Sequence, residues 1–82
     1  MKRGNYALTS HAIDEMQPDE LTELDIEEAV LNSKIVRLQK DHLGRTKYTL
    51  EGLTKNLRKI RVICRFSDSG ELIVIITVYE II

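Results

Sequence analysis

The periodicity of apolar residues changes once along this 82-residue chain, at Ser33. Before Ser33, apolar residues recur at helical spacing in two short segments, residues 11–16 and 24–32. After it, residues 34–39, 45–51, 57–66 and 71–81 read as strands, with alternating or Ile- and Val-rich patterns. The sequence therefore predicts a single α+β domain over residues 1–82, in which two short N-terminal helices pack on a four-stranded antiparallel β-meander. Residues 6–8 are compatible with a further short edge strand.

Local signals support the boundaries of these segments. Thr9 and Ser10 are both good N-cap residues for the first helix, and Thr22 with Asp25 resembles a capping box for the second. Residues 67–70 (Ser-Asp-Ser-Gly) have the composition of a three-residue hairpin loop that ends in a left-handed glycine. This loop would place Ser67 opposite Glu71 and fix the register of the last two strands.

That register assigns the two faces of the last hairpin. One face is entirely apolar and is the predicted core, with Ile60, Val62, Cys64 and Phe66 opposite Val78, Ile76, Val74 and Leu72. The other face holds Lys59, Arg61, Ile63 and Arg65 opposite Tyr79, Thr77, Ile75 and Ile73. Its cations and hydroxyls suit contacts with phosphates and bases, although basic residues are also common on an ordinary solvated face. The three isoleucines indicate that a chain terminus or a partner covers part of this face.

The net charge of −1 conceals an uneven distribution. Residues 1–33 contain two basic and eight acidic residues, whereas residues 34–82 contain ten basic and five acidic ones. Such a chain can present a basic face to nucleic acid, or its acidic helices can simply neutralise its basic sheet.

Composition restricts the chemistry. One cysteine cannot form an internal disulfide or a cysteine-rich zinc site, and neither a metal nor another cofactor is expected. Cys64 itself fits the alternation of the predicted core face. No apolar run reaches the roughly 18 residues of a membrane span, so a cytoplasmic protein is predicted. His11 at the start of a helix is the main candidate for proton transfer, because the helix dipole favours neutral imidazole; the alternative is a histidine that only bonds the backbone.

Several motifs together resemble domain-of-unknown-function family 4258. They are Tyr6-x-Leu8-Thr9-x-His11-Ala12, Met16, Leu24-x-Ile26-x-x-Ala29, Lys47-Tyr48-x-x-x-x-Gly52 and Ile76-Thr77-Val78-Tyr79. The resemblance implies a small bacterial protein with a RelE-like or barnase-like toxin architecture, often encoded beside a zinc-finger antitoxin of the MqsA type. It therefore implies the toxin of a toxin–antitoxin pair that acts as a metal-independent ribonuclease, with RNA and the antitoxin as partners.

The resemblance also marks individual positions. His11, Lys47-Tyr48, Thr77 and Tyr79 match family motifs, and the basic residue of the third strand matches Arg58 or Arg61, of which alternation favours Arg61. The predicted catalytic residues are His11, Arg61 and Tyr79, and the predicted RNA-binding residues are Lys47, Lys59, Arg65 and Thr77. Many members carry arginines four and eight residues after the histidine, where this chain has Glu15 and Asp19, which would repel RNA.

Two functions follow as alternatives. The first is RNA cleavage through the ribose 2′-hydroxyl, which needs a base, an acid and cations for the phosphate. The second is a non-catalytic interaction module that binds a partner protein or a second copy, as a homodimer, through the sheet face and the last strand. The position of His11 relative to Arg61 and Tyr79 distinguishes them.

Overall fold

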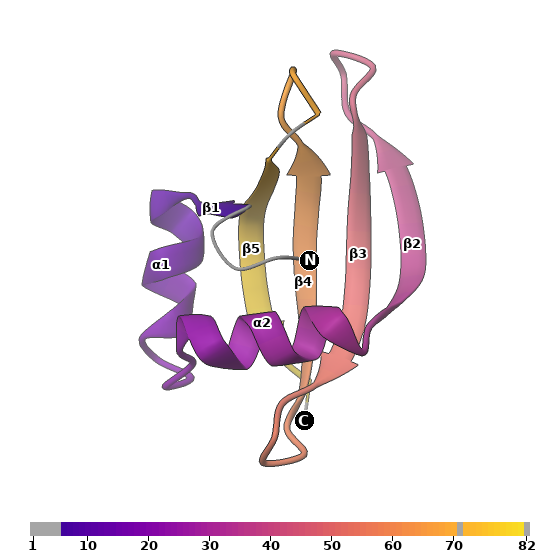
Figure 1. Cartoon of the computed structure of the whole chain (residues 1–82). Helices are drawn as coiled ribbons and strands as arrows, with labels where there is room; N and C mark the ends of the chain where they lie inside the picture. Colours follow the sequence, from indigo (N-terminus) through magenta and orange to yellow (C-terminus); the bar gives the residue numbers. More distant parts are fainter. Residues whose placement is uncertain (1–5, 71, 82) are drawn as a thin grey trace.

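Two helices and a five-stranded mixed sheet make up the computed structural model, which describes residues 6–70 and 72–81 (Figure 1). The strand order in the sheet is β1-β5-β4-β3-β2. The elements in chain order are β1 (Tyr6–Leu8), α1 (Ser10–Met16), α2 (Glu23–Leu31), β2 (Lys34–Lys40), β3 (Thr46–Leu53), β4 (Lys59–Phe66) and β5 (Ile73–Glu80). The predicted α+β class is confirmed.

The prediction of four antiparallel strands is wrong, because β1 adds a fifth strand. It pairs with β5 in parallel, with Tyr6 opposite Ile73 and Leu8 opposite Ile75. Strands β2 to β5 follow one another through short turns, which makes their antiparallel order readable from the sequence. The further edge strand expected over residues 6–8 is confirmed, but nothing local to this three-residue segment indicates its partner, which lies more than sixty residues away.

Both helices begin at the capping residues expected from the sequence. The Thr9 hydroxyl accepts a hydrogen bond from the backbone N–H of Ala12 at 3.1 Å. Thr22 and Asp25 form a complete capping box, with reciprocal side-chain to backbone bonds of 3.1 and 3.0 Å. These bonds satisfy backbone donors that a helix N-terminus leaves free, so the helix starts are specified locally.

The predicted register of the last hairpin is wrong in two places. The N–H of Ser67 donates to the carbonyl of Leu72 at 2.8 Å, so the loop is one residue longer than expected; Glu71, its expected partner, lies outside the described residues. A second irregularity follows between Ile63 and Cys64, where β5 contains one extra residue. Each extra residue exchanges the two faces of the strand.

Between the turn and the bulge, the side chains of β5 consequently lie on the face opposite to the predicted one. Beyond the bulge they lie on the predicted face. Ile75 pairs with Cys64 and is fully buried, and Ile73 packs against the core, although both were predicted on the other face. Beyond the bulge the two errors cancel, so Val78 is buried as predicted and Arg61 shares a face with Tyr79. Arg61 pairs directly with Tyr79, not with Thr77 as expected.

The core lies between the two helices and one face of the sheet. It consists of Ala12, Met16, Leu21, Ile26, Ala29, Ile60, Val62, Cys64, Ile75 and Val78. Burial raises the pKa of the Cys64 thiol to about 11, which agrees with its prediction as a small apolar core residue. In Figure 1, α2 crosses the sheet near the end opposite the β2–β3 and β4–β5 turns, and α1 lies beside β5.

Candidate functional site

Both described helices pack on one face of the sheet, and the opposite face carries the candidate site. We call it the open face and define it by strand register, because residues paired across a ladder lie on the same side. Its described side chains on β2 to β5 are Lys34, Arg37, Gln39, Lys47, Thr49, Glu51, Leu53, Lys59, Arg61, Ile63, Arg65, Val74, Thr77 and Tyr79. The predicted sheet-face residues Lys47, Lys59, Arg61, Arg65, Thr77 and Tyr79 are all among them.

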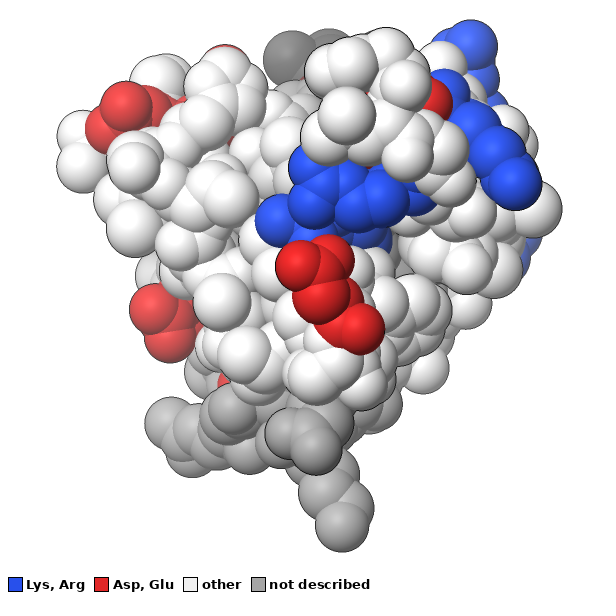
Figure 2. Space-filling model, turned by 90° about the horizontal axis from the view of Figure 1, so that it is seen from above, with Lys and Arg blue, Asp and Glu red and all other residues white. Residues whose placement is uncertain are grey.

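Positive charge dominates the open face. Among its described residues it carries six cations and one carboxylate, Glu51; the cations are Lys34, Arg37, Lys47, Lys59, Arg61 and Arg65. Helices α1 and α2 contain six acidic residues and no lysine or arginine. In Figure 2 the blue side chains lie in the centre and toward one side of the molecule, with a red patch directly beside them, and further red patches lie toward the opposite side. The uneven charge of the sequence thus becomes a basic sheet face and an acidic helical layer.

Arg61 occupies the centre of a row of paired residues across four strands. The row runs Lys34, Glu51, Arg61, Tyr79 from β2 to β5. The Nε of Arg61 donates to a carboxylate oxygen of Glu51 at 3.2 Å. The pKa of Arg61 is raised, mainly by the Tyr79 hydroxyl on its other side and secondly by the Glu51 carboxylate. The guanidinium is held by Glu51 on one side yet remains 40 % exposed, so it is positioned and accessible to an anion.

The next row is less polar and lies in the middle of the open face. Arg37, Thr49, Ile63 and Thr77 pair across the same four strands. Of the three isoleucines predicted on this face, only Ile63 is found there. The apolar surface expected to bind a partner is therefore smaller than predicted. The last strand, β5, is also paired on its second edge, because β1 occupies that edge over residues 73–75.

His11 belongs to the helical layer. It is the second residue of α1, its side chain is 64 % exposed, and its Nε2 lies 3.6 Å from a carboxylate oxygen of Glu15. Thr9, two residues earlier, ties the start of α1 to β5 through Ile75 and Ile76, at 3.1 and 3.0 Å. Within the described ranges, no hydrogen bond or ion pair joins His11 to Arg61 or Tyr79. The structure thus brings two of the three predicted catalytic residues together and places the third on the neighbouring layer.

Comparison with known proteins identifies the family. The model of the domain-of-unknown-function family DUF4258 matches residues 8–80, nearly the whole chain. The chain belongs to the DUF4258 family. Searches of curated proteins and of solved structures gave no match.

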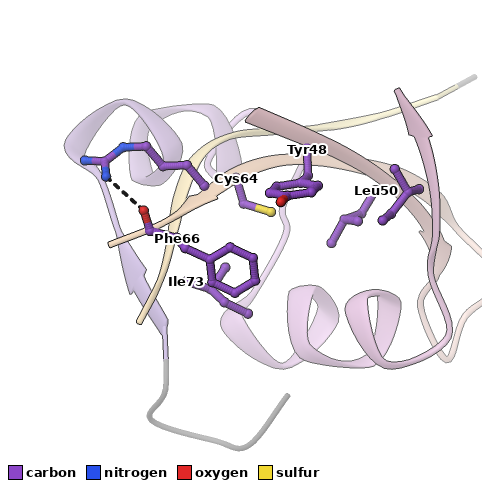
Figure 3. Close-up of a pocket in the computed structure, with 7 residues that line it drawn as sticks. Tyr48, Leu50, Cys64, Phe66 and Ile73 are labelled. Carbon is purple, nitrogen blue, oxygen red and sulfur yellow. Dashed lines mark hydrogen bonds between the residues drawn. The ribbon is translucent and has the colours of Figure 1, made fainter. Parts of the chain in front are cut away.

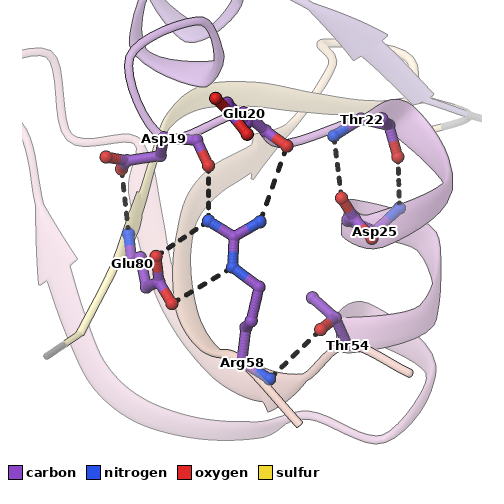
Figure 4. A network of polar contacts seen from close by, with 7 residues as sticks. All are labelled: Asp19, Glu20, Thr22, Asp25, Thr54, Arg58 and Glu80. Carbon is purple, nitrogen blue, oxygen red and sulfur yellow. Dashed lines mark hydrogen bonds and ion pairs between the residues drawn. The ribbon is translucent and has the colours of Figure 1, made fainter. Parts of the chain in front are cut away.

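In this DUF4258 domain, Arg58 and Arg61 are the two alternatives for the basic residue that the family resemblance led us to expect on the third predicted strand. Their surroundings differ. Arg58 forms a bidentate pair with Glu80, with distances of 2.8 and 3.1 Å (Figure 4). It also donates to the backbone carbonyls of Asp19 and Glu20, between α1 and α2. Arg58 therefore fastens this connection to the sheet, and Arg61 is the arginine left on the open face.

Glu15 and Asp19, at positions where the family resemblance led us to expect arginines, also have partners in this DUF4258 domain. Glu15 faces His11, and a carboxylate oxygen of Asp19 accepts the backbone N–H of Glu80 at 3.3 Å. Asp19 thus belongs to the network around Arg58 (Figure 4). Both acids lie in the helical layer or its connection, not among the cations of the open face.

Sequence reasoning missed three charged residues of the open face: Lys34, Arg37 and Glu51. A bulge between Ile35 and Arg37 places Lys34 and Arg37 on the same face, although their spacing in a regular strand predicts opposite faces. Glu51 could have been found from the alternation of Lys47, Thr49 and Glu51 in β3, had the β3–β4 register been considered. In the described part of the chain, no three His, Cys, Asp or Glu side chains cluster as metal ligands, and no helix is long and apolar enough to cross a membrane.

Proposed function

We propose that this DUF4258 domain is the toxin of a bacterial toxin–antitoxin pair, which binds RNA on the open face and cleaves it as a metal-independent ribonuclease. The observation that carries the proposal is the arrangement around Arg61. It is an accessible guanidinium bound by the Glu51 carboxylate and paired across the strands with Tyr79, on a face with five further cations. Such a face attracts phosphates, and a fixed arginine can hold one of them in a defined geometry.

The chemistry requires only groups that the chain contains. A base removes the proton from a ribose 2′-hydroxyl, and the oxygen attacks the adjacent phosphorus. The bond to the 5′-oxygen breaks, and an acid protonates that leaving oxygen. In the proposed site Arg61 stabilises the charge that develops on the phosphate. The Tyr79 hydroxyl on one side of Arg61 and the Glu51 carboxylate on the other are candidates for proton transfer, whereas His11 lies in the helical layer and is not part of this arrangement.

RNA binding is tested with Lys59 and a matched lysine outside the open face. Lys55 follows β3, is 81 % exposed and pairs with Glu28 of α2. Fluorescence anisotropy with a labelled single-stranded RNA should show weaker binding for Lys59→Gln and unchanged binding for Lys55→Gln. The slope of log affinity against log salt should fall by about one for Lys59→Gln, because one phosphate contact is lost. Equal effects of the two substitutions would contradict binding on the open face.

Cleavage is tested with Tyr79→Phe, which keeps the ring and removes the hydroxyl. If Tyr79 transfers a proton, the variant should still bind RNA but lose growth arrest on expression and cleavage of RNA in vitro by about 100-fold or more. Circular dichroism checks that it remains folded. RNA binding by wild type without any cleavage would reject the nuclease and leave an RNA-binding protein.

A further inference from the structure

On the helix side of the sheet, an apolar region near the β2–β3 and β4–β5 turns is not covered by either described helix. Helix α2 crosses the sheet at the opposite end, so that it does not cover this region (Figure 1). A pocket of about 200 Å³ lies here, lined by Ile35, Tyr48, Leu50, Cys64, Arg65, Phe66 and Ile73 (Figure 3). The rings of Tyr48 and Phe66 meet edge to face, with centroids 5.6 Å apart. Four strands therefore contribute to one apolar depression.

Strand β2 forms one side of this depression and is the edge of the sheet. All seven of its residues are exposed, and no described strand pairs with its outer side. Ile35 and Leu38, on the same side as the pocket, are 56 % and 61 % exposed. An edge strand offers unpaired backbone N–H and C=O groups, and an adjoining apolar pocket offers sites for alternate side chains. Together they are the two requirements for adding a strand from another chain.

The charges of β2 select the kind of strand that can be added. The strand contains Lys34, Arg37 and Lys40 and no acidic residue. If two copies paired antiparallel about Arg37, the two arginines would face each other and Lys34 would face Lys40. Like charges directly opposite one another destabilise strand pairing, whereas opposite charges stabilise it. In this register the edge is unfavourable for a second copy, and its three cations without a carboxylate favour an acidic strand.

We propose that β2 and the adjoining pocket bind an extended acidic segment of a partner protein as a sixth strand. Because side chains alternate along a strand, the segment has apolar residues on the side of Ile35 and Leu38. Its acidic residues lie on the side of Lys34 and Arg37. This inference does not depend on the proposed RNA chemistry, since the pocket lies on the opposite side of the sheet from Arg61 and Tyr79.

The test uses a fluorescein-labelled peptide that alternates glutamate and isoleucine over nine residues. We expect it to bind the full chain, and Leu38→Glu to weaken binding by about tenfold or more through lost apolar contact and added repulsion. The matched control is Leu24→Glu on α2, at a site 56 % exposed and remote from β2, which should leave binding unchanged. Circular dichroism of both variants establishes that they are folded.

Three further peptides separate the contributions. A peptide that alternates lysine and isoleucine tests the role of charge. A peptide with the same composition as the first, but with its glutamates and isoleucines in separate blocks, tests the role of alternation. A version of the first peptide methylated on alternate backbone nitrogens tests strand pairing. Each should bind at least about tenfold more weakly than the first. No binding of the first peptide at millimolar concentration, or equal binding of any control peptide, would overturn the proposal. Sedimentation showing a dimer that Leu38→Glu dissociates would overturn it in favour of a second copy.

Discussion

Replacing Gly52 with alanine tests how closely α2 packs on the sheet. Gly52 lies in β3 and is buried beneath Ala29 of α2. A β-carbon at this position would be 2.0 Å from the carbonyl oxygen of Ala29 and 2.7 Å from its carbonyl carbon. Real β-carbons essentially never come within 3.0 Å of such atoms, and the obstructing atoms belong to backbone, which no side-chain rotation can move. The helix and the strand must therefore separate to admit one methyl group.

The cost can be estimated from general experience with overpacked cores. Extra methyl or methylene groups in a packed core cost about 1–3 kcal/mol, and a clash with backbone belongs at the upper end, about 3 kcal/mol. At about 0.05–0.15 kcal/mol per residue, the whole domain has a free energy of unfolding of roughly 4–12 kcal/mol. Gly52→Ala should thus remove a large share of the stability and lower Tm by about 12–24 °C.

Urea denaturation followed by circular dichroism measures this difference, with Gly70→Ala as the control. Gly70 lies in the β4–β5 turn at φ +77°, and a β-carbon added there would meet no atom within 4 Å beyond its own chain neighbours, so alanine costs only backbone strain of about 1–2 kcal/mol. We expect Gly52→Ala to be clearly less stable than Gly70→Ala. A Gly52→Ala protein as stable as wild type, or more stable than Gly70→Ala, would refute the packing argument.

Two other predictions concern the register of β5 and the Arg58–Glu80 pair. Ile75→Asp should unfold the domain, because burying an unpaired carboxylate costs several kcal/mol of folding free energy. The Thr77→Ala variant should stay folded. Equal tolerance of the two substitutions in thermal melts would show that the register is wrong. The Arg58 side chain lowers the pKa of Glu80, so the pair's contribution is complete above the ordinary glutamate pKa of about 4.3 and is lost as pH falls through the lowered value. Arg58→Ala should therefore be less stable than wild type at neutral pH, and the difference in urea midpoint should narrow below about pH 4; a difference independent of pH would show that Glu80 ionisation does not contribute.

Features that depend on neighbouring residues were predictable from the sequence. Thr9 and Thr22 cap the helices because their hydroxyls reach backbone donors three residues away. The four long strands were recognisable because their alternating or Ile- and Val-rich patterns are visible within each segment. The segregation of charge was visible as well, since the acids concentrate before Ser33 and the bases after it.

The tertiary structure alone decided which side chains share the candidate site. One extra residue in the β4–β5 turn and one in the bulge after Ile75 set the faces of the last hairpin, and the bulge in β2 placed Arg37 beside Lys34. The pairing of Glu51 with Arg61 depends on the register between two strands, and β1 found its partner across most of the chain. The physical reason is the two-residue period of a strand. Inserting one residue reverses every later side chain, and the position of the insertion depends on which apolar residues the helices and the sheet can bury together.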